Sequence, residues 1–537
     1  YDIMIDRPSP LAPRQLRWPI RERLNVAGEP LIKLDEESVR AVLPLIEKHD
    51  IEALAVGLLH AYANPAHEQR VREIIQSAFP KLPISLSSEV CPEIREYERQ
   101  STTCANAYVQ PKMSAYLTAL DARLREKGFS CPFLLMTSGG GLTTLENAIR
   151  FPIRLVESGP AGGAILAAEV AAEAGLDRVV SYDMGGTTAK ICLIDDGQPL
   201  STRTFEVARA YRNLKGSGLP VRIPAIEMVE IGAGGGSLAH VDGLGRLEVG
   251  PESAGSYPGP ACYDLGGTLP SVTDADVTLG KISPELFAGG NVRLVPEKAE
   301  EAIRSEVGVP LNMPVPLAAF AVSEIVDENM ANAARVHAIE WGKDIAERTM
   351  IAFGGAAPLH ASRLAEKLGL TSVIVPSGAG VGSAVGFLRA PISYEVVRSR
   401  YMRLDGFDAD GANRLLEDMS REARAVVQAG AAGAELIETR LAYMRYVGQG
   451  HEITVPLPDR PLVSSDRKNL LDSFDEAYRA LYGQTVPGMQ PEILSWTLTV
   501  STVKKPIAKR SDKVVLDEEF SLPSQTRELF DPTLQEF

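Results

Sequence analysis

The amino-acid sequence predicts an α/β fold. Apolar runs of strand length alternate with segments whose apolar residues recur at helical spacing, and glycine pairs stand where several expected strands end. The chain has 537 residues, enough for about three or four domains. Its hydrophobic share of 45% and charged share of 23% are those of an ordinary globular protein with a sizeable core.

The first part of the chain predicts three helices and one strand. A helix over 36–49 follows Asp35, whose side chain is suited to cap it, and an apolar strand is expected over 54–60. Further helices are expected over 65–78 and 101–127, the second of them ended by Gly128.

The middle of the chain predicts strands that end at glycines. They are expected over 133–137, over 178–184 and 190–194 as a pair, over 349–353 with a helix starting near 359, and over 372–376 as a buried strand. After Pro391 glycines become rarer and charges more frequent. A helix over 412–429 and a strand over 441–447 there indicate a C-terminal α+β domain. We therefore divide the chain into segments 1–95, 96–395 and 396–537.

Composition excludes several classes of function. The net charge of −15 disfavours a nucleic-acid or anionic-membrane surface. The five cysteines form no C-x-x-C pair, which argues against a disulfide framework or a structural zinc site and favours a reducing cytoplasm. A long uncharged stretch, 371–388, contains Pro376 and four glycines, so it is expected to form strand and turn rather than a membrane span.

The segment from Asp183 to Lys190 carries the sharpest chemical pattern. A hydrophobic strand runs into Asp183 and is followed by Gly185, Gly186, Thr187 and Thr188. Glycines allow backbone N–H groups to point at phosphate oxygens, the threonines add hydroxyl donors, and a strand-end carboxylate suits a magnesium shell. The alternative is a β-hairpin whose glycines only satisfy the turn. We favour phosphate binding.

Two further glycine groups are candidates for nucleotide contact. A strand ends at Gly354-Gly355 and a helix follows at once, which offers free N–H groups or is an ordinary tight turn. The run Gly234-Gly235-Gly236 implies close backbone approach to another group, or a flexible loop. Neither a G-x-G-x-x-G fingerprint nor a G-x-x-x-x-G-K-[ST] motif is present.

Histidines and serines give weaker signals. His360, one turn into the helix after Gly354-Gly355, is placed to reach a phosphate or a transferred proton, with core packing as the alternative. His337 is expected in the core. No H-E-x-x-H, H-x-H or close His/carboxylate cluster is visible, so a protein-held zinc or iron site is not expected. Ser158 lacks the G-x-S-x-G context of a nucleophile and is better suited to cap the helix that follows.

These motifs together resemble known families. The Asp-x-Gly-Gly-Thr hairpin and the later strand-Gly-Gly-helix resemble the actin/hexokinase type of ATPase fold, with two lobes around a nucleotide cleft. Several blocks, in order along nearly the whole chain, resemble the hydantoinase A / 5-oxoprolinase family. They are Ser88–Arg99, Met136–Gly141, Glu157–Gly163, Asp183–Thr187, Gly232–Ser237, Val249–Gly255, Pro258–Tyr263, Val272–Asp276 and Gly354–Ala361.

The resemblance implies ATP-driven chemistry on an unreactive carbonyl. It implies ATP and Mg²⁺, or Mn²⁺, as cofactors, a hydantoinase B type subunit as partner in a hetero-oligomer, and a small cyclic amide or ketone as substrate. It places the phosphates at the glycine hairpin, residues 185–188, and the adenosine at Gly354-Gly355. From the residues themselves we expect Asp183 at the metal and Asp183 and His360 as the catalytic groups. It also implies a further Asp-x-Gly-Gly-Thr loop, which we expect upstream of Tyr1. Lys190 stands where many relatives have Asp, which exchanges a possible metal ligand for a phosphate contact.

We expect a nucleotide-binding subunit of an ATP-dependent amidohydrolase that opens a hydantoin, 5-oxoproline or another lactam by phosphorylating its carbonyl oxygen. An acetone- or acetophenone-type ketone carboxylase subunit is the enzymatic alternative. The third alternative is a structural subunit with an incomplete ATP site. The sequence leaves these three open.

Overall fold

The computed structural model describes residues 8–210, 216–503 and 526–537. The chain forms two compact units. Unit 1 takes its described residues from Tyr1–Ser158, Ser201–Ala225 and Ala390–Lys505, and unit 2 takes its from Gly159–Leu200, Ile226–Arg389 and Pro506–Phe537. Each unit therefore combines segments that are distant in the sequence. The division into 1–95, 96–395 and 396–537 stays a prediction.

The N-terminal part of unit 1 is a small α/β layer. Strands β3 (Leu54–Val56) and β4 (Ile84–Leu86) pair in parallel. They pack with helices α1 (Glu36–Arg40), α2 (Leu43–Lys48) and α3 (Ala66–Ala78) around a buried cluster that includes Val39, Ile46, Val71 and Leu86.

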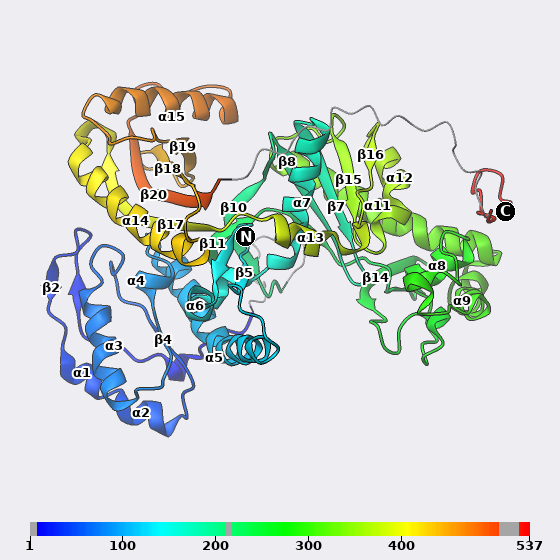
Figure 1. Ribbon diagram of the computed structural model, residues 1–537, viewed down its shortest axis with the longest axis horizontal. Coiled ribbons are helices and arrows are strands. Elements are labelled where there is room, and N and C mark those ends of the chain that lie inside the picture. Colours follow the sequence, from blue (N-terminus) through cyan, green and yellow to red (C-terminus); the bar gives the residue numbers. More distant parts are fainter. Residues whose placement is uncertain (1–7, 211–215, 504–525) are drawn as a thin grey trace. The chain divides into compact units, whose positions relative to one another are not determined.

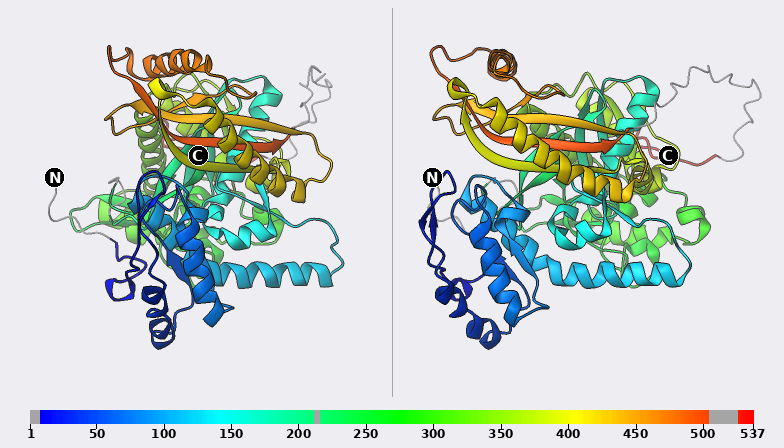
Figure 2. Two further views of the ribbon diagram at one scale, coloured as in Figure 1. Left: turned by 90° about the vertical axis from the view of Figure 1, so that its left-hand side faces the viewer. Right: turned by 60° about the vertical axis from the view of Figure 1, so that its left-hand side comes forward.

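Figure 2 shows α5 (Glu96–Glu126) as one long helix, and Gly128 follows it at φ +88°, as expected.

The helix predicted over 36–49 is broken in two. Asp35 caps α1 as expected, because its carboxylate accepts the N–H groups of Glu37 and Ser38. Pro44 lies in the first turn of α2, where its missing N–H costs nothing, but the same residue cannot continue the hydrogen bonding of α1. The observed strand is also shorter than the predicted one over 54–60, because β3 ends at Val56.

The C-terminal part of unit 1 is an antiparallel sheet covered by helices, which agrees with the α+β pattern of the sequence. The strand order is β17 (Ser393–Arg403), β20 (Pro491–Thr502), β18 (Leu436–Tyr446) and β19 (Ile453–Pro456). Figure 1 shows helices α14 (Ala409–Gly430) and α15 (Asp466–Tyr482) beside this sheet. They share a core with it that includes Trp496 and Phe474.

The remaining strands of unit 1 form short pairs. They are β1 (Arg23–Leu24) with β2 (Pro30–Ile32), β5 (Leu134–Met136) with β6 (Leu142–Thr144), and β10 (Ser201–Val207) with β11 (Leu219–Ile226). The short helices here are α4 (Ser87–Val90) and α6 (Leu145–Arg150).

Unit 2 is built on a mixed sheet. Its order is β12 (Val229–Ile231), β8 (Ala189–Asp195), β7 (Arg178–Met184), β15 (Thr349–Phe353) and β16 (Val373–Ile374), with β9 (Gln198–Pro199) pairing β8. The β7–β8 pair is antiparallel, as predicted, whereas β7–β15 and β15–β16 are parallel. Figure 1 shows β7, β15 and β16 beside one another.

Helices cover both faces of this sheet. Helices α8 (Val272–Thr278), α11 (Val315–Glu340) and α12 (Ala357–Leu368) share a core with Tyr182 and Met184. The opposite face carries Phe353, whose ring lies against Gly163 of α7 (Ser158–Ala174) and Gly382 of α13 (Gly382–Arg389). The other elements of unit 2 are β13 (Ser237–Val241), β14 (Leu247–Ser253), α9 (Pro296–Ile303) and α10 (Val309–Leu311).

Two predictions for residues 371–388 are wrong. The expected buried strand is a two-residue edge strand, β16, in which the Val373 side chain is 37% exposed. The same stretch also contains most of helix α13, although only strand and turn were predicted there. Among the described residues no single helix has the length and apolarity to cross a membrane; the helical stretches 296–311 and 315–340, bent by 88°, reach that composition only jointly.

Candidate functional site

The β7–β8 hairpin has the geometry that its sequence predicts. Asp183 pairs with Lys190 and Met184 with Ala189, and the Gly185 N–H donates to the Thr188 carbonyl at 3.2 Å. A Cβ atom placed on Gly185 or Gly186 would meet no atom within 4 Å. The tip of the hairpin therefore borders open space, where a ligand could approach the backbone closely.

The strand-Gly-Gly-helix segment lies directly against this hairpin. Gly354 has φ +98°, and a Cβ there would stand 2.4 Å from the Met184 carbonyl oxygen and 2.6 Å from Oδ1 of Asp183. The Ala356 N–H donates to the same Met184 carbonyl at 2.9 Å. Only a glycine fits at 354, whereas Gly355 is exposed and a Cβ there would meet nothing within 4 Å. The structure thus brings the two predicted glycine turns into direct contact, with open space beside each of them.

Asp183 is partly buried at the base of the hairpin. Ser383 of α13 donates its hydroxyl to Oδ2 of Asp183 at 3.1 Å. Burial raises the pKa of the Asp183 carboxyl, while the Ser383 hydrogen bond and the charge of Lys190 act in the opposite direction. A carboxylate that is incompletely compensated in this way is well suited to accept a cation.

Ser383 is a residue that the sequence reading missed. It ends the run Ser377-Gly-Ala-Gly-Val-Gly-Ser383, which contributes a second contact to the site because the Ala379 carbonyl accepts the Gly354 N–H at 2.8 Å. The feature of the sequence that could have indicated this contact is the run of small residues over 377–383, directly after a predicted strand. We interpreted that run only as turn structure.

The run Gly234-Gly235-Gly236 is buried against the hairpin. The Gly235 N–H donates to the Gly185 carbonyl at 3.0 Å and the Gly236 N–H to the Gly186 carbonyl at 2.6 Å, and Gly234 donates to Oγ of Ser237. A Cβ on Gly234 would stand 2.7 Å from the Gly186 and Thr187 backbone. The close approach that the glycines predicted is therefore to the hairpin, and none of their amides is free for a phosphate oxygen in this conformation.

Lys190 is engaged beside the hairpin loop. Its Nζ atom lies 3.1 Å from Oε1 of Glu230 and donates to Oγ1 of Thr188 at 2.9 Å. To contact a phosphate, the Lys190 ammonium group would therefore have to leave the half-exposed Glu230 carboxylate. A phosphate oxygen would be the stronger partner of the two.

His360 lies in a different environment from the one we expected. It is fully buried, with Nδ1 at 2.8 Å from Asp327 of α11 and Nε2 at 3.0 Å from Asp276 of α8. Burial alone would lower the pKa of His360, but the two carboxylates outweigh it and raise the pKa to about 9. His360 belongs to the helix layer that packs on Tyr182, and successive residues of a strand face opposite sides, so Asp183 faces away from this layer.

No close His/carboxylate cluster was expected from the sequence, but the fold forms one at His360. Asp276 and Asp327 lie 84 and 33 residues from His360 in the chain, so only the fold brings them together. Within the described ranges, nevertheless, no group of three or more His, Cys, Asp or Glu side chains is arranged to hold a metal ion. A metal held mainly by phosphate oxygens, water and one carboxylate fits Asp183 better, and Mg²⁺ is commonly bound in this way.

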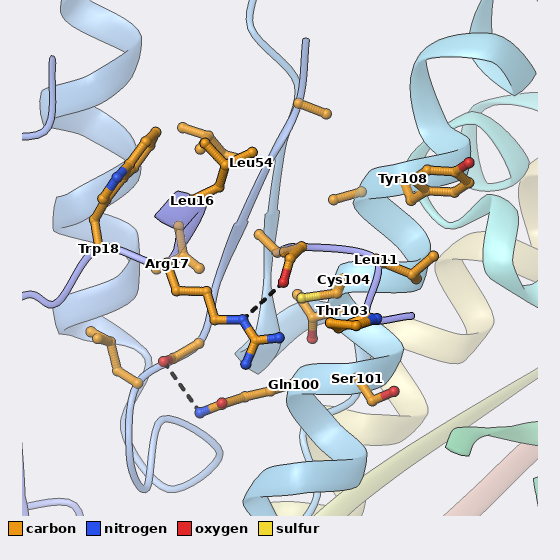
Figure 3. A pocket seen from close by; sticks show the side chains of 18 of the residues that line it. Leu11, Leu16, Arg17, Trp18, Leu54, Gln100, Ser101, Thr103, Cys104 and Tyr108 are labelled. Carbon is orange, nitrogen blue, oxygen red and sulfur yellow. Dashed lines mark hydrogen bonds between the residues drawn. The ribbon is translucent and has the colours of Figure 1, made fainter. Parts of the chain in front are cut away.

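A separate cavity of about 1330 Å³ lies within unit 1. Figure 3 shows Leu16, Trp18 and Leu54 on one side of it and Cys104 and Tyr108 of α5 on the other. Arg17 crosses the cavity and donates to the Ala12 carbonyl at 2.9 Å. No candidate residue from the sequence lines this cavity.

Comparison with known proteins agrees with the motifs. The family described as hydantoinase/oxoprolinase matches residues 99–396, and the hydantoinase/oxoprolinase N-terminal region matches residues 1–79. The caprolactamase subunit alpha of Pseudomonas jessenii is 34% identical over 504 residues, which cover 93% of this chain and 71% of that protein. The acetophenone carboxylase gamma subunit of Aromatoleum aromaticum is 38% identical over 404 residues, covering 74% of this chain and 53% of the relative.

A solved structure shows the same relationship. The crystal structure of the ATP-dependent caprolactamase from Pseudomonas jessenii superposes with a TM-score of 0.79 at 32% sequence identity, covering 94% of this chain and 73% of that one. The family match over residues 99–396 includes the Asp183 hairpin and the Gly354-Gly355 turn. The chain belongs to the hydantoinase/oxoprolinase family.

Proposed function

We propose that this chain is the nucleotide-binding subunit of an ATP-dependent amidohydrolase that opens a small cyclic amide by phosphorylating its carbonyl oxygen. One observation carries the proposal: the Asp183 hairpin and the Gly354-Gly355 turn, distant in sequence, lie against each other and border open space at Gly185, Gly186 and Gly355. We further propose that unit 2 is one lobe of an actin/hexokinase-like ATPase fold.

The hairpin supplies most of the proposed phosphate contacts. The exposed backbone at Gly186 and Thr187 and the hydroxyl groups of Thr187 and Thr188 offer donors that do not depend on net positive charge. Hydrogen bonds to a charged group contribute roughly 1.5–3 kcal/mol each. The N-terminus of α12, directly after Gly355, would add favourable dipoles on the side of the adenosine.

Asp183 is the residue that we assign to the metal. Mg²⁺, or Mn²⁺, bound there would neutralise charge on the phosphate oxygens of ATP, and its position needs only one protein carboxylate. Ser383 would hold the carboxylate in place. Lys190 would leave Glu230 for a phosphate oxygen. We assign His360 no direct catalytic contact, because both of its ring nitrogens are engaged with buried carboxylates.

The relatives support a hydrolase that works in an assembly. Caprolactamase is named for a lactam, is described as ATP-dependent and has a subunit called alpha, which implies further subunits in that protein. We propose a hydantoinase B type subunit as the partner here, a hydantoin, 5-oxoproline or related lactam as substrate, and the cytoplasm as the compartment.

A ketone carboxylase subunit is the second candidate. The acetophenone carboxylase gamma subunit is slightly more identical to this chain than the caprolactamase subunit, although over a shorter stretch. Both reactions begin with phosphorylation of a carbonyl oxygen. In the hydrolase the activated amide is then attacked and the ring opens, whereas in the carboxylase the phosphorylated ketone, as an enol phosphate, is the attacking group.

Substrate-dependent ATP turnover by the intact enzyme separates these candidates. We expect ATP hydrolysis to be stimulated by hydantoins or lactams in bicarbonate-free buffer, with formation of the ring-opened product. Stimulation only by a ketone together with bicarbonate would instead establish the carboxylase. Absence of nucleotide binding by the complete assembly would reject both and leave a structural subunit.

A further inference from the structure

Helix α8 is short, but its start is fixed on several sides. Ser271 and Asp274 form a capping box at its N-terminus. The Asp274 carboxylate also accepts the N–H groups of Ala261 and Cys262, at 3.2 and 2.7 Å. Every residue of α8 is buried. The helix is therefore a rigid piece of the core, although it lies outside the glycine turns that border the open space.

One end of α8 holds the support of the hairpin. Thr273 donates both its backbone N–H and its hydroxyl to the Gly235 carbonyl, each at 2.7 Å. The Gly235 N–H in turn donates to the Gly185 carbonyl at 3.0 Å. Thr273 thus reaches the proposed phosphate hairpin through a single intervening residue, and no flexible side chain lies along this path.

The other end of α8 holds the helix that follows the second glycine turn. Asp276 accepts from Nε2 of His360, which lies one turn into α12, and Lys281 stands 3.1 Å from the other oxygen of the same carboxylate. Asp327 of α11 fixes the opposite nitrogen of His360. Because α12 begins at Ala357, two residues after Gly355, this contact limits where the Gly354-Gly355 turn can lie.

We infer that α8 sets the spacing between the two glycine turns, with Thr273 and Asp276 as positioning residues for nucleotide binding. The inference rests on the proposed function, since it assumes that the two turns hold a nucleotide between them. It explains why a buried Thr-Asp-Ala-Asp segment accompanies the glycine motifs, and it assigns His360 a mechanical rather than a chemical task.

The test compares two threonines of the same helix. Thr273→Val removes the hydroxyl bond to Gly235 while keeping the shape of the side chain. Thr278→Val is the matched control, because Thr278 is equally buried at 8% exposure and its hydroxyl donates to the Asp274 carbonyl at 2.8 Å, within α8 itself. Each variant loses one buried hydroxyl bond, so similar falls in thermal midpoint are expected.

Nucleotide affinity is expected to separate the pair. In the intact enzyme, Thr273→Val should raise the Kd for an ATP analogue and the KM for ATP by about tenfold, because a less firmly held hairpin must be ordered when the nucleotide binds. Thr278→Val should leave both values within about twofold of wild type. Thr273→Ser, which keeps the hydroxyl, should restore most of the affinity.

Equal effects of Thr273→Val and Thr278→Val on nucleotide affinity would overturn the positioning role and leave the proposed function intact. A wild-type enzyme that binds no nucleotide would overturn the proposed function first, and the role of α8 with it. If Thr273→Val does not fold, Asp276→Asn gives the same comparison from the other end of the helix, with an unchanged Kd as the contradicting result.

Discussion

At the residue scale, Asp183 is the group on which the proposed chemistry depends. Asp183→Asn keeps an acceptor for the Ser383 hydroxyl but removes the charge that a metal requires. We expect metal-dependent ATP turnover to fall on the order of 100-fold, with little change in thermal midpoint. A steady-state ATPase assay beside a melting curve measures both. Turnover close to wild type would remove Asp183 from the site.

Gly355 tests whether the open space at the glycine turns is occupied by a nucleotide. Gly355→Val places a branched side chain in that space and should weaken binding of an ATP analogue at least tenfold by steric exclusion. Gly406→Val is the matched control, because Gly406 is also exposed, has no positive φ and has no neighbour within 4 Å of its Cβ position. Equal affinities in the two variants would mean that this turn is only structural.

The neighbouring Gly354 should behave differently, because its constraint comes from the protein itself. At φ +98° and with the Met184 oxygen 2.4 Å from a Cβ, Gly354→Ala requires the backbone to shift. We expect a loss of stability on the order of 1–3 kcal/mol, measured by denaturant unfolding. An unchanged unfolding midpoint would show that the two turns are not in the close contact described above.

At the scale of elements, the sequence predicted those strands and helices whose signal is local. The β7–β8 hairpin, β15 and the cap at Asp35 follow from glycine, apolar and capping residues that are neighbours in the chain. The break at Pro44 and the exposed edge strand β16 were missed, because apolar periodicity neither detects a proline-induced restart nor distinguishes an edge from a central strand.

The cluster around His360 shows the limit of sequence reasoning at the site. Its members come from α8, α11 and α12, so no spacing in the chain announces it. The pattern placed His360 near a glycine turn, which was sufficient to suggest catalysis. The face of the sheet on which His360 lies is set by how α12 packs. On that face His360 contacts the carboxylates of Asp276 and Asp327.

This cluster makes stability depend on pH. The pKa of His360 is raised to about 9 from 6.5, so its stabilising charge is fully present below about pH 6.5 and is lost as the pH rises through 9. The groups that face it are Asp276, Asp327 and, beside Asp276, Lys281; Tyr182 lies close to both carboxylates.

We expect the free energy of unfolding to decline between pH 6.5 and pH 9 by on the order of 3 kcal/mol from this residue. Denaturant unfolding at a series of pH values measures the decline, and His360→Gln should lack that part of it. A variant with the same pH profile as wild type would show that His360 is neutral in the folded protein.

At the scale of the whole chain, distant segments meet in ways that a linear division does not predict. In unit 1 the buried Glu93, 2% exposed, accepts from Arg203 of β10 and Arg222 of β11, each at 2.5 Å. Arg203 also pairs with Glu395 of β17 at 2.7 Å. Burial would raise the pKa of Glu93, but the two arginines hold it below its usual value. Glu93 and Arg203 together therefore connect three parts of the sequence.

Removing that charge should therefore destabilise the protein strongly. Glu93→Gln removes the carboxylate that Arg203 and Arg222 share, which leaves Arg203 with Glu395 and Arg222 with Glu452 at 3.8 Å. Breaking a buried pair costs about 3–5 kcal/mol. Glu366→Gln, at an exposed pair with Arg363, is the control and should change stability by less than about 1 kcal/mol. Comparable unfolding midpoints for the two variants would contradict the importance of the buried network.

The most direct test of the central claim is the stoichiometry between ATP hydrolysed and cyclic amide opened by the intact enzyme in bicarbonate-free buffer. If the Asp183 hairpin and the Gly354-Gly355 turn bind the ATP that phosphorylates the carbonyl, ring-opened product should form only with ATP, in constant proportion to it. Asp183→Asn should lower ATP consumption and ring opening together, on the order of 100-fold. Ring opening without ATP, or ATP consumption that persists at the wild-type rate in Asp183→Asn, would contradict the account.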